Sequence, residues 1–328
     1  MSKFIASGTY GCVIKPSLNC KDNDNKIKNE TVAKLFSSKS EWEYEIKENN
    51  LISDIDKDHK FTVEMLNSCP ISIDYINNNV ANINNCSIIN NKQEIYQIIY
   101  KDGGNNLRNL FTNPQDLNIN DFLKKFGIIF DGLYEINMKG LCHRDIKLEN
   151  LLFDGNKVTL IDFGLMEEKT KLYTYNNLLL YVNNDIYYYP SEMRLYAALK
   201  LNKSIDVNKL NSIKFVNFLE NYSIQKSDYS EIIKNMLNKM KEDTYKFADE
   251  IKKIKSLDEI KFQNIDVYLL GIALFEIVFS LIINNLLTDL KKELLELIER
   301  MIKINPYNRI TIKEAKDIYK DIYKDLYK

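Results

Sequence analysis

Four polar side chains in the middle of the chain have the types and the spacing that phosphoryl transfer requires. Asp145, Lys147 and Asn150 lie within residues 143–150, and Asp162 follows a short distance along the chain. An aspartate can accept the proton of an attacking hydroxyl, a lysine can neutralise phosphate charge, and amide or carboxylate oxygens can hold Mg²⁺. The sequence therefore predicts Asp145 as the base and Lys147 as a charge stabiliser. It predicts Asn150 and Asp162 as the metal ligands.

These side chains belong to two short motifs whose order is more specific than either motif alone. The first is His-Arg-Asp at residues 143–145, and the second is Asp-Phe-Gly at residues 162–164. Two apolar runs, residues 151–153 and 158–161, flank an Asp-Gly-Asn turn between the motifs and predict a hairpin. The second run would place Asp162 at the end of a strand. Each tripeptide is common by chance, but together and in this order they are specific.

The predicted secondary structure changes along the chain. The first hundred residues contain short apolar strands and one helical pattern, whereas most of the later residues have helical periodicity. A strand-rich front and a helix-rich back predict an α+β fold with two lobes.

With this organisation the chain resembles the eukaryotic-type protein kinases of the Ser/Thr type, and the resemblance covers nearly all of it. It implies a small β-rich N-lobe at residues 1–101 and a large helical C-lobe at residues 102–328. It also implies ATP and Mg²⁺ as cofactors and a protein substrate that carries the acceptor Ser or Thr. Lys147 supports this acceptor class, because tyrosine kinases usually differ at that position.

The resemblance assigns residues 7–13 to the glycine-rich loop that covers the phosphates. Gly8 and Gly11 would let backbone N–H groups approach the anion, which a Cβ would obstruct. Ala6 stands where the family has its first glycine, and Val13 is the last residue of the loop motif. We expect all four residues at the nucleotide site.

The same resemblance assigns Lys34 to the lysine that pairs with the α- and β-phosphates. Val32 replaces the alanine that the family usually has two residues earlier, which should crowd the adenine. Several carboxylates on the following predicted helix could hold the lysine: Glu41, Glu43, Glu45 and Glu48. We predict Glu48, with Glu45 as the alternative, because the apolar residues that follow Glu48 have the spacing of a helix face turned into the fold.

Other segments resemble structural parts of the family. Residues 98–102 resemble the hinge that binds adenine through its backbone. Glu192 resembles the acid of the Ala-Pro-Glu element, and Arg309 resembles its buried partner. Asp266 opens an apolar helix that should brace the catalytic loop.

Two connections depart from the family in length. The long connection between Glu192 and Asp266 predicts a helical insertion at about residues 193–260. In its second half an apolar stripe recurs at the spacing of one buried helix face: Ile233, Met236, Leu237, Met240, Phe247, Ile251 and Ile254. The connection from Asp266 to Arg309 is short, so we expect the docking helix of the family to be reduced. The insertion could either govern the choice of substrate or simply cover apolar surface. Asp185 stands where Ser/Thr kinases usually have a threonine.

Residues 165–188 should form an activation loop. Arg144 precedes the predicted base, and in the family such an arginine can receive a loop phosphate. Thr170 and Thr174 are the predicted acceptors, although Asp185 could supply the negative charge instead.

Composition excludes several classes of protein. The formal net charge is −1, so no nucleic-acid or membrane partner is expected. Residues 267–283 are apolar enough to resemble a membrane span but contain Glu276, which favours a buried core helix. Only two histidines are present, which argues against a histidine metal site or a Ser–His–Asp mechanism.

The five cysteines are odd in number and form no C-x-x-C pair, so we expect no disulfide framework and a reducing compartment. The start of the chain has no apolar run typical of a signal peptide, and the cytoplasm is therefore predicted. Residues 11–20 resemble kinases of large DNA viruses, which would place the protein in the host cytoplasm or the virion.

Two rival functions remain at this point. A pseudokinase would act through the helical insertion, but pseudokinases usually lose residues equivalent to Lys34, Asp145 or Asp162, and all three are present. A small-molecule kinase of related fold is disfavoured by Glu192 and Arg309, which are typical of protein kinases.

Overall fold

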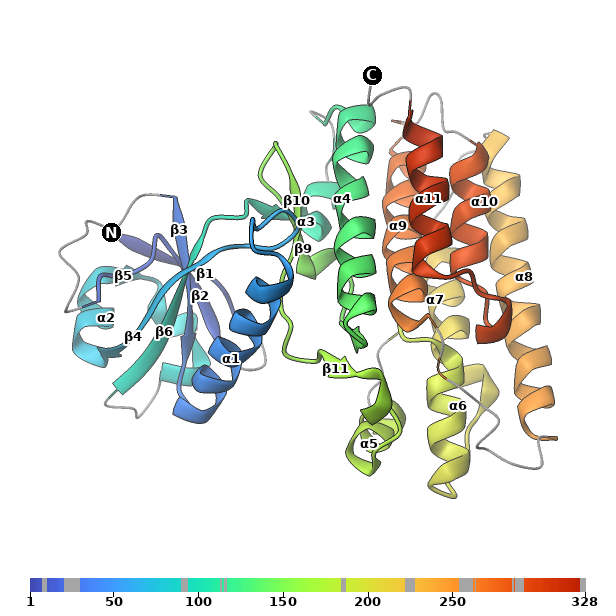
Figure 1. Cartoon of the computed structure of the whole chain (residues 1–328), viewed down its shortest axis with the longest axis horizontal. Helices are drawn as coiled ribbons and strands as arrows, with labels where there is room; N and C mark the ends of the chain where they lie inside the picture. Colours follow the sequence, from blue (N-terminus) through green and yellow to red (C-terminus); the bar gives the residue numbers. More distant parts are fainter. Residues whose placement is uncertain are drawn as a thin grey trace. The chain divides into compact units, whose positions relative to one another are not determined.

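The computed structural model describes residues 1–7, 11–20, 30–89, 94–112, 114, 117–183, 187–221, 228–253, 262, 264–284, 286 and 292–324. They belong to two compact units (Figure 1). Unit 1 comprises Met1–Gly104 and Leu152–Gly164, and unit 2 comprises Asn105–Leu151 and Leu165–Lys328. The boundary lies close to the one expected after residue 101. The segment Leu152–Gly164, which was expected in the C-lobe, belongs to unit 1.

Unit 1 is built around a six-stranded sheet in the order β4-β6-β3-β2-β1-β5. Its strands are β1 (Ser2–Ser7), β2 (Cys12–Lys15), β3 (Thr31–Phe36), β4 (Met65–Ser72), β5 (Val80–Ala81) and β6 (Glu94–Lys101). Neighbouring strands are antiparallel except for β1 and β5. Ala33 and Leu35 of β3 are fully buried, whereas the alternating residues Val32 and Lys34 are partly exposed, as the two-residue period of a strand requires.

The register of the sheet aligns residues from four strands in one row. Ala6 pairs with Val13, Val13 with Lys34, and Lys34 with Ile98. The strand-rich prediction for the front of the chain is confirmed, and three of the predicted nucleotide-site residues are cross-strand neighbours.

Two helices and a hairpin complete unit 1. Helix α1 (Lys39–Ile55) begins at its N-cap Ser38 and packs along β3 and β6, and α2 (Ile73–Asn79) packs against β4 and β5. The hairpin of β9 (Leu151–Phe153) and β10 (Val158–Leu160) is joined to the rest of the unit by a bond from the Leu160 N–H to the Phe61 carbonyl, at 2.8 Å.

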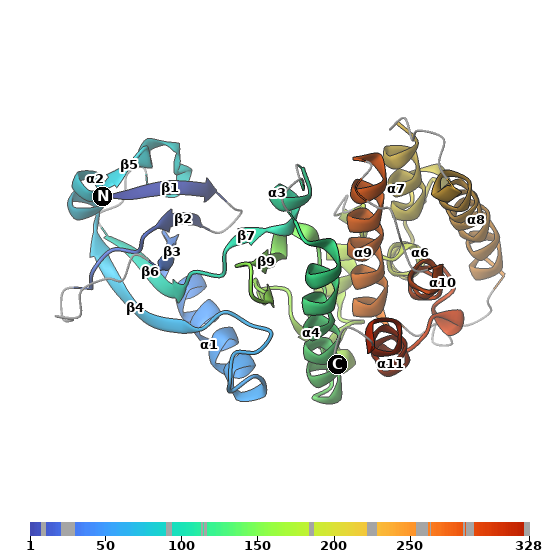
Figure 2. The ribbon, with the colours of Figure 1, turned by 90° about the horizontal axis from the view of Figure 1, so that it is seen from above.

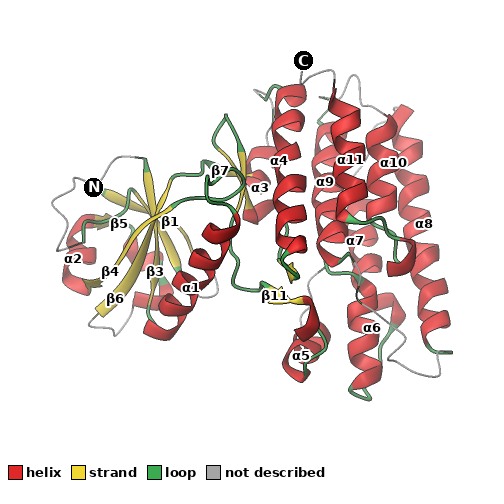
Figure 3. Ribbon diagram, in the orientation of Figure 1, coloured by secondary structure: helices red, strands yellow, loops and turns green. Residues whose placement is uncertain are grey.

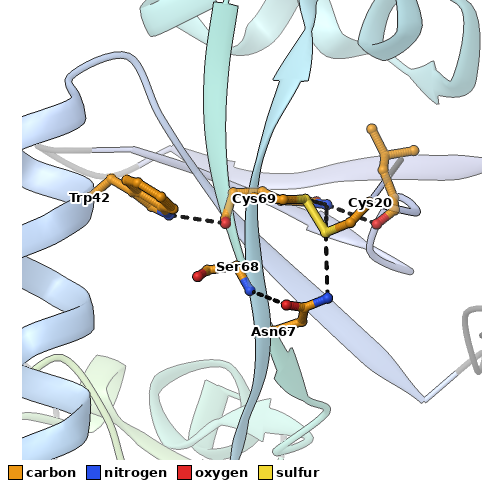
Figure 4. The surroundings of a disulfide bond; sticks show 7 residues. Cys20, Trp42, Asn67, Ser68 and Cys69 are labelled. Atoms are coloured by element: carbon orange, nitrogen blue, oxygen red, sulfur yellow. Dashed lines mark hydrogen bonds between the residues drawn. A yellow bond between two sulfur atoms is a disulfide. The ribbon is translucent and has the colours of Figure 1, made fainter. Parts of the chain in front are cut away.

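Two disulfides lie within unit 1, and they overturn the expectation that the cysteines form no framework. Cys12 pairs with Cys86, and Cys20 pairs with Cys69 (Figure 4). The partners are 74 and 49 residues apart in sequence, so spacing along the chain could not reveal that they meet. Cys142 is a buried free thiol.

Unit 2 is mainly helical (Figure 3). Its α-helices are α3 (Leu107–Thr112), α4 (Ile119–Met138), α5 (Tyr175–Asn183), α6 (Ser191–Lys200), α7 (Asn211–Glu220), α8 (Asp228–Ile251), α9 (Ile265–Ile283), α10 (Lys292–Met301) and α11 (Ile312–Tyr323). Helix α11 packs against both α4 and α9, and α10 packs against α9 and α11. Figure 2 shows these long helices lying side by side.

Helix α9 forms the centre of unit 2. It is the one helix of the described chain that is long and apolar enough to cross a membrane, but 94% of its apolar window is buried inside the protein. Glu276, within this apolar run, is also buried and pairs with Arg108 of α3 at 3.1 Å. The burial and the ion pair fit the predicted core helix.

The insertion forms part of the packed core of unit 2. The expected apolar stripe on α8 is buried at every described position: Ile233, Met236, Leu237, Met240, Phe247 and Ile251. Ile254, the last predicted member, lies outside the described residues. Buried hydroxyls connect the helices, because Ser212 of α7 bonds to Ser191 of α6 at 2.6 Å and to Thr244 of α8 at 2.7 Å. Between α9 and Arg309, the described residues form a single α-helix, α10.

Candidate active site

Asp266 holds the catalytic loop from the first turn of α9. Its two carboxylate oxygens accept the backbone N–H groups of His143, at 2.8 Å, and of Arg144, at 2.9 Å. Arg144 has a φ of 66°, a left-handed conformation that non-glycine residues adopt only when their surroundings enforce it. The predicted bracing role of Asp266 is confirmed.

His143 is a packed structural residue. It is fully buried, and its Nδ1 accepts the Asp145 N–H at 3.2 Å. This bond fixes the backbone just before the predicted base.

The catalytic-loop residues Asp145, Lys147 and Asn150 meet around one carboxylate. Lys147 Nζ lies 3.0 Å from Asp145 Oδ1 and 2.8 Å from Oδ2. The Asn150 amide donates to the Asp145 carbonyl at 2.8 Å and to Oδ2 at 2.7 Å. Tyr188, which sequence reasoning did not assign, donates its hydroxyl to Oδ1 at 2.5 Å.

Arg144 ties the loop to the residues that follow the Asp-Phe-Gly motif. Its Nε donates to the Leu165 carbonyl at 2.6 Å, and its Nη1 donates to Asn177 at 2.8 Å and to Tyr181 at 3.1 Å. The guanidinium therefore already has neutral acceptors on α5. Thr170 and Thr174 are exposed, and their phosphorylation stays a prediction. Asp185 lies outside the described residues.

Glu192 and Arg309 form the expected buried pair. Arg309 Nη1 lies 2.8 Å from Glu192 Oε1, and neither side chain has exposed surface. Arg309 also stacks on the Tyr268 ring and donates to the Lys303 carbonyl. Removing one partner of such a pair typically costs about 3–5 kcal/mol, so the pair anchors the first turn of α6.

In unit 1, Lys34 pairs with Glu45 rather than with Glu48. Its Nζ lies 2.5 Å from Glu45 Oε2 and 4.0 Å from Asp162 Oδ1. Burial by itself lowers the pKa of Lys34, but the attraction of Glu45 and Asp162 outweighs burial and raises the pKa above its ordinary value. The lysine is therefore held as a cation.

The prediction of Glu48 was wrong because of the axial position of the two acids on α1. Glu45 and Glu48 lie three residues apart, which separates them by about 4.5 Å along the helix axis, and the carboxylate that the fold brings to Lys34 is that of Glu45. The apolar spacing was misleading as well, since Leu51 is 41% exposed.

Two residues that sequence reasoning missed hold Glu45 in place. Tyr100 of β6 donates its hydroxyl to Glu45 Oε1 at 3.1 Å. Asn49, one helical turn after Glu45, donates to the Glu45 carbonyl at 2.7 Å and to the Tyr100 hydroxyl at 2.9 Å. A polar residue four positions after the acid, on the same helix face, was the available signal.

The predicted glycine-rich loop is described only in part. Gly8 lies outside the described residues, whereas Ala6 ends β1 and Val13 lies in β2. At Gly11 a Cβ would collide with the Leu35 carbonyl oxygen. This glycine is therefore required by the close packing of the hairpin on β3, a reason different from the predicted phosphate contact.

Asp162 follows β10 with its side chain partly exposed and a φ of 64°. The described residues contain no cluster of three or more potential metal ligands of the His, Cys, Asp or Glu type. Mg²⁺ needs no such cluster, because it is usually bound by one or two carboxylates together with substrate phosphates. The exposed carboxylate of Asp162 and the amide oxygen of Asn150 suit this kind of binding, each within its own unit.

A cavity of about 490 Å³ lies beside the catalytic loop in unit 2. Its polar lining is a network in which Arg108 bonds to Glu149 at 2.9 Å, to Tyr187 at 2.8 Å and to Glu276. Part of its apolar wall comes from α7 of the insertion, through Phe218 and Leu219.

Comparisons with known proteins show which family the chain resembles. The family model described as a protein kinase domain matches residues 2–319. A probable serine/threonine-protein kinase of Encephalitozoon cuniculi is 42% identical over 55 residues, which is 17% of this chain and 11% of that protein. A fatty acyl-CoA synthetase and RNA processing-associated kinase of Saccharomyces cerevisiae is 48% identical over 44 residues, which is 13% of this chain and 5% of that protein. The matches thus span only a small part of these relatives.

Proposed function

Because this chain belongs to the protein kinase family, we propose that it is an active enzyme that transfers the γ-phosphoryl group of ATP to Ser or Thr side chains of protein substrates. The observation that carries the proposal is the arrangement of Lys147 and Asn150 around Asp145. A pseudokinase would have no need to keep a general base, a cation and an amide in hydrogen-bonding contact.

In the proposed reaction, Asp145 accepts the proton of the acceptor hydroxyl as the oxygen attacks phosphorus. Lys147 neutralises charge that develops on the transferred group, and Lys34, held by Glu45, orients the phosphates. Mg²⁺, which the family resemblance assigns to Asn150 and Asp162, would supply further neutralisation of phosphate charge. The bond between the γ-phosphorus and the bridging oxygen breaks, and ADP leaves.

The protein acceptor and its Ser or Thr hydroxyl are the finer part of the proposal. Lys147 supports this acceptor class through the family resemblance. The cavity next to Leu148 and Glu149 supports a protein substrate, because it offers both an apolar wall and carboxylates near the loop that carries the base. Since α7 lines this cavity, the insertion could help to choose the substrate in addition to its role in the core.

Asp145→Asn tests the proposal. The variant should bind Mg·ATP as the wild type does but transfer phosphate about 10²–10⁴-fold more slowly, which is the usual contribution of a general base. Radiolabelled transfer to a Ser/Thr peptide library and nucleotide binding by calorimetry are the measurements. Asp58→Asn, at an exposed surface position, is the matched control.

Two results would contradict the assignment. Transfer by Asp145→Asn at the wild-type rate would remove Asp145 from the chemistry. Wild-type protein that binds Mg·ATP but phosphorylates no protein or peptide would favour the pseudokinase alternative.

A further inference from the structure

Three consecutive tyrosines, Tyr187, Tyr188 and Tyr189, precede Pro190, and the proposed mechanism leaves the middle one without a role. The three side chains have different surroundings. Tyr187 belongs to the Arg108 network, at 2.8 Å from Nη2. Tyr189 is buried, and its hydroxyl has no hydrogen-bond partner within the described part of the chain. Only Tyr188 contacts the predicted base.

The Tyr188 hydroxyl lies where a substrate hydroxyl would have to bind. It donates to Asp145 Oδ1 at 2.5 Å and accepts from Lys147 Nζ at 3.2 Å. A substrate hydroxyl needs these same two relations, because its proton goes to the base while a cation stands beside the reacting oxygen.

The hydrogen-bonding capacity of Asp145 is full in this arrangement. A carboxylate offers about four lone-pair positions. Lys147 donates to both oxygens, Asn150 donates to Oδ2 and Tyr188 donates to Oδ1. The Asp145 side chain is 8% exposed, so little of it remains open to an incoming acceptor.

We propose that Tyr188 is an internal latch, a side chain whose hydroxyl occupies the acceptor position on Asp145 and must move before a substrate hydroxyl can bind. This proposal rests on the proposed function. Tyr188 is the donor that can leave, because Lys147 and Asn150 come from the catalytic loop itself and are needed for phosphate charge and metal. Tyr188 comes from a different segment of the chain and carries neither task.

The latch makes acceptor binding compete with an intramolecular hydrogen bond. A protein whose binding-competent state is only partly populated shows an apparent affinity reduced by that fraction. Removal of the hydroxyl should therefore improve acceptor binding, without taking away a group that the chemical step uses.

Tyr188→Phe tests the latch. The variant should lower the KM for a Ser/Thr peptide about tenfold, leave kcat nearly unchanged, and raise acceptor-free ATP hydrolysis several-fold, because water can then reach Asp145.

Tyr189→Phe is the matched control: it removes an adjacent buried hydroxyl that has no partner in the described structure, and it should leave KM and hydrolysis as in the wild type. Tyr188→Met, an unbranched apolar side chain that fills similar space, should behave as Tyr188→Phe. Thermal unfolding of each variant reports whether it folds.

The possible outcomes separate the two proposals. A wild type that transfers phosphate, together with Tyr188 variants of unchanged KM and unchanged hydrolysis, overturns the latch alone. A fall in kcat in both folded Tyr188 variants also overturns it, since the hydroxyl then positions the base instead of blocking it. Absence of transfer in every form, with nucleotide bound, overturns the latch and the proposed function together.

Discussion

The ion pair of Lys34 shows how a single residue position decides a site. Glu45 and Glu48 are both on α1, and Glu48 is also largely buried. Of these two acids, it is Glu45 that pairs with the ammonium, and Tyr100 and Asn49 hold it there. The consequence for function is that the charge of Glu45 keeps Lys34 cationic and oriented.

Glu45→Gln should therefore impair nucleotide placement. A hydrogen bond to a charged group is worth about 1.5–3 kcal/mol, so we expect kcat/KM for ATP to fall by about 10- to 100-fold. Steady-state kinetics at varied ATP concentration is the measurement.

Glu48→Gln is the matched control for this change. It makes the same chemical substitution one helical turn away and leaves the Lys34–Glu45 contact in place, so most of the activity should remain. A larger loss in the Glu48 variant than in the Glu45 variant would restore Glu48 as the functional partner.

At the scale of elements, the disulfides join segments that are distant along the chain. Cys12 opens β2, within the segment assigned to the glycine-rich loop, and its partner Cys86 follows a short 3₁₀ turn (η1, Ile83–Asn85). Cys20 and Cys69 link the residues after β2 to β4. Around this second bond, Trp42 of α1 donates to the Gln97 carbonyl at 3.1 Å, and the Gln97 amide donates to the Leu18 carbonyl at 2.8 Å (Figure 4). The disulfide thus lies in a hydrogen-bonded region of the sheet.

Reduction should destabilise unit 1. Closing a loop of 74 residues removes entropy from the unfolded chain, and the loss of one such bond typically costs about 2–5 kcal/mol. Chemical unfolding with and without dithiothreitol, followed by Trp42 fluorescence, measures the effect. The double variant Cys12→Ala/Cys86→Ala should be less stable and respond less to reductant, whereas Cys142→Ala should respond as the wild type does.

Intact mass under non-reducing conditions gives an independent reading. Protein with both bonds should weigh about 4 Da less than the fully reduced chain, because each disulfide replaces two thiol hydrogens. A chain that keeps all thiols free, and whose stability ignores reductant, would contradict the disulfides. The odd cysteine count was the basis for predicting a reducing compartment, and the localisation stays a prediction.

At the scale of the whole molecule, buried tyrosines link stability to alkaline pH. Burial raises the pKa of each of six phenols above its ordinary value near 10, and Tyr181 reaches about 12. These are Tyr181, Tyr187, Tyr188, Tyr189, Tyr268 and Tyr323. The neutral phenol is thus favoured by the folded state.

The sign of the pH dependence follows from these raised pKa values. Below pH 10 the phenols are protonated in both the folded and the unfolded chain, so their contribution to stability is fully present. Above pH 10 the unfolded chain loses protons that the folded chain retains, and each retained proton lowers the free energy of unfolding by about 1.4 kcal/mol per pH unit. Stability should therefore fall steeply from pH 10 upward.

Tyrosinate absorbance and unfolding followed together at rising pH check this expectation. The buried phenols should ionise in step with unfolding, because the folded chain holds them in the neutral form. Complete tyrosine ionisation in a chain that is still folded would show that the six phenols are accessible to solvent.

The sequence by itself determined the parts of the site that lie close together along the chain. One loop contains Asp145, Lys147 and Asn150. The types and spacing of these residues indicate phosphoryl transfer without any knowledge of the fold. The long apolar run of α9 and the stripe on α8 were predictable for a similar reason, since helical periodicity is a local property. The two-lobed α+β organisation was predicted from the change along the chain, from short apolar strands in the first hundred residues to helical periodicity in the later ones.

Tertiary structure alone decided which residues meet across long separations. Glu45 pairs with Lys34 because of the position that α1 takes along β3. The disulfides form because of which strands and turns lie side by side. The contact of Tyr188 with Asp145 joins residues 43 positions apart. Such contacts arise from the packing of elements, and residue spacing does not encode them because each requires two segments to be placed in three dimensions.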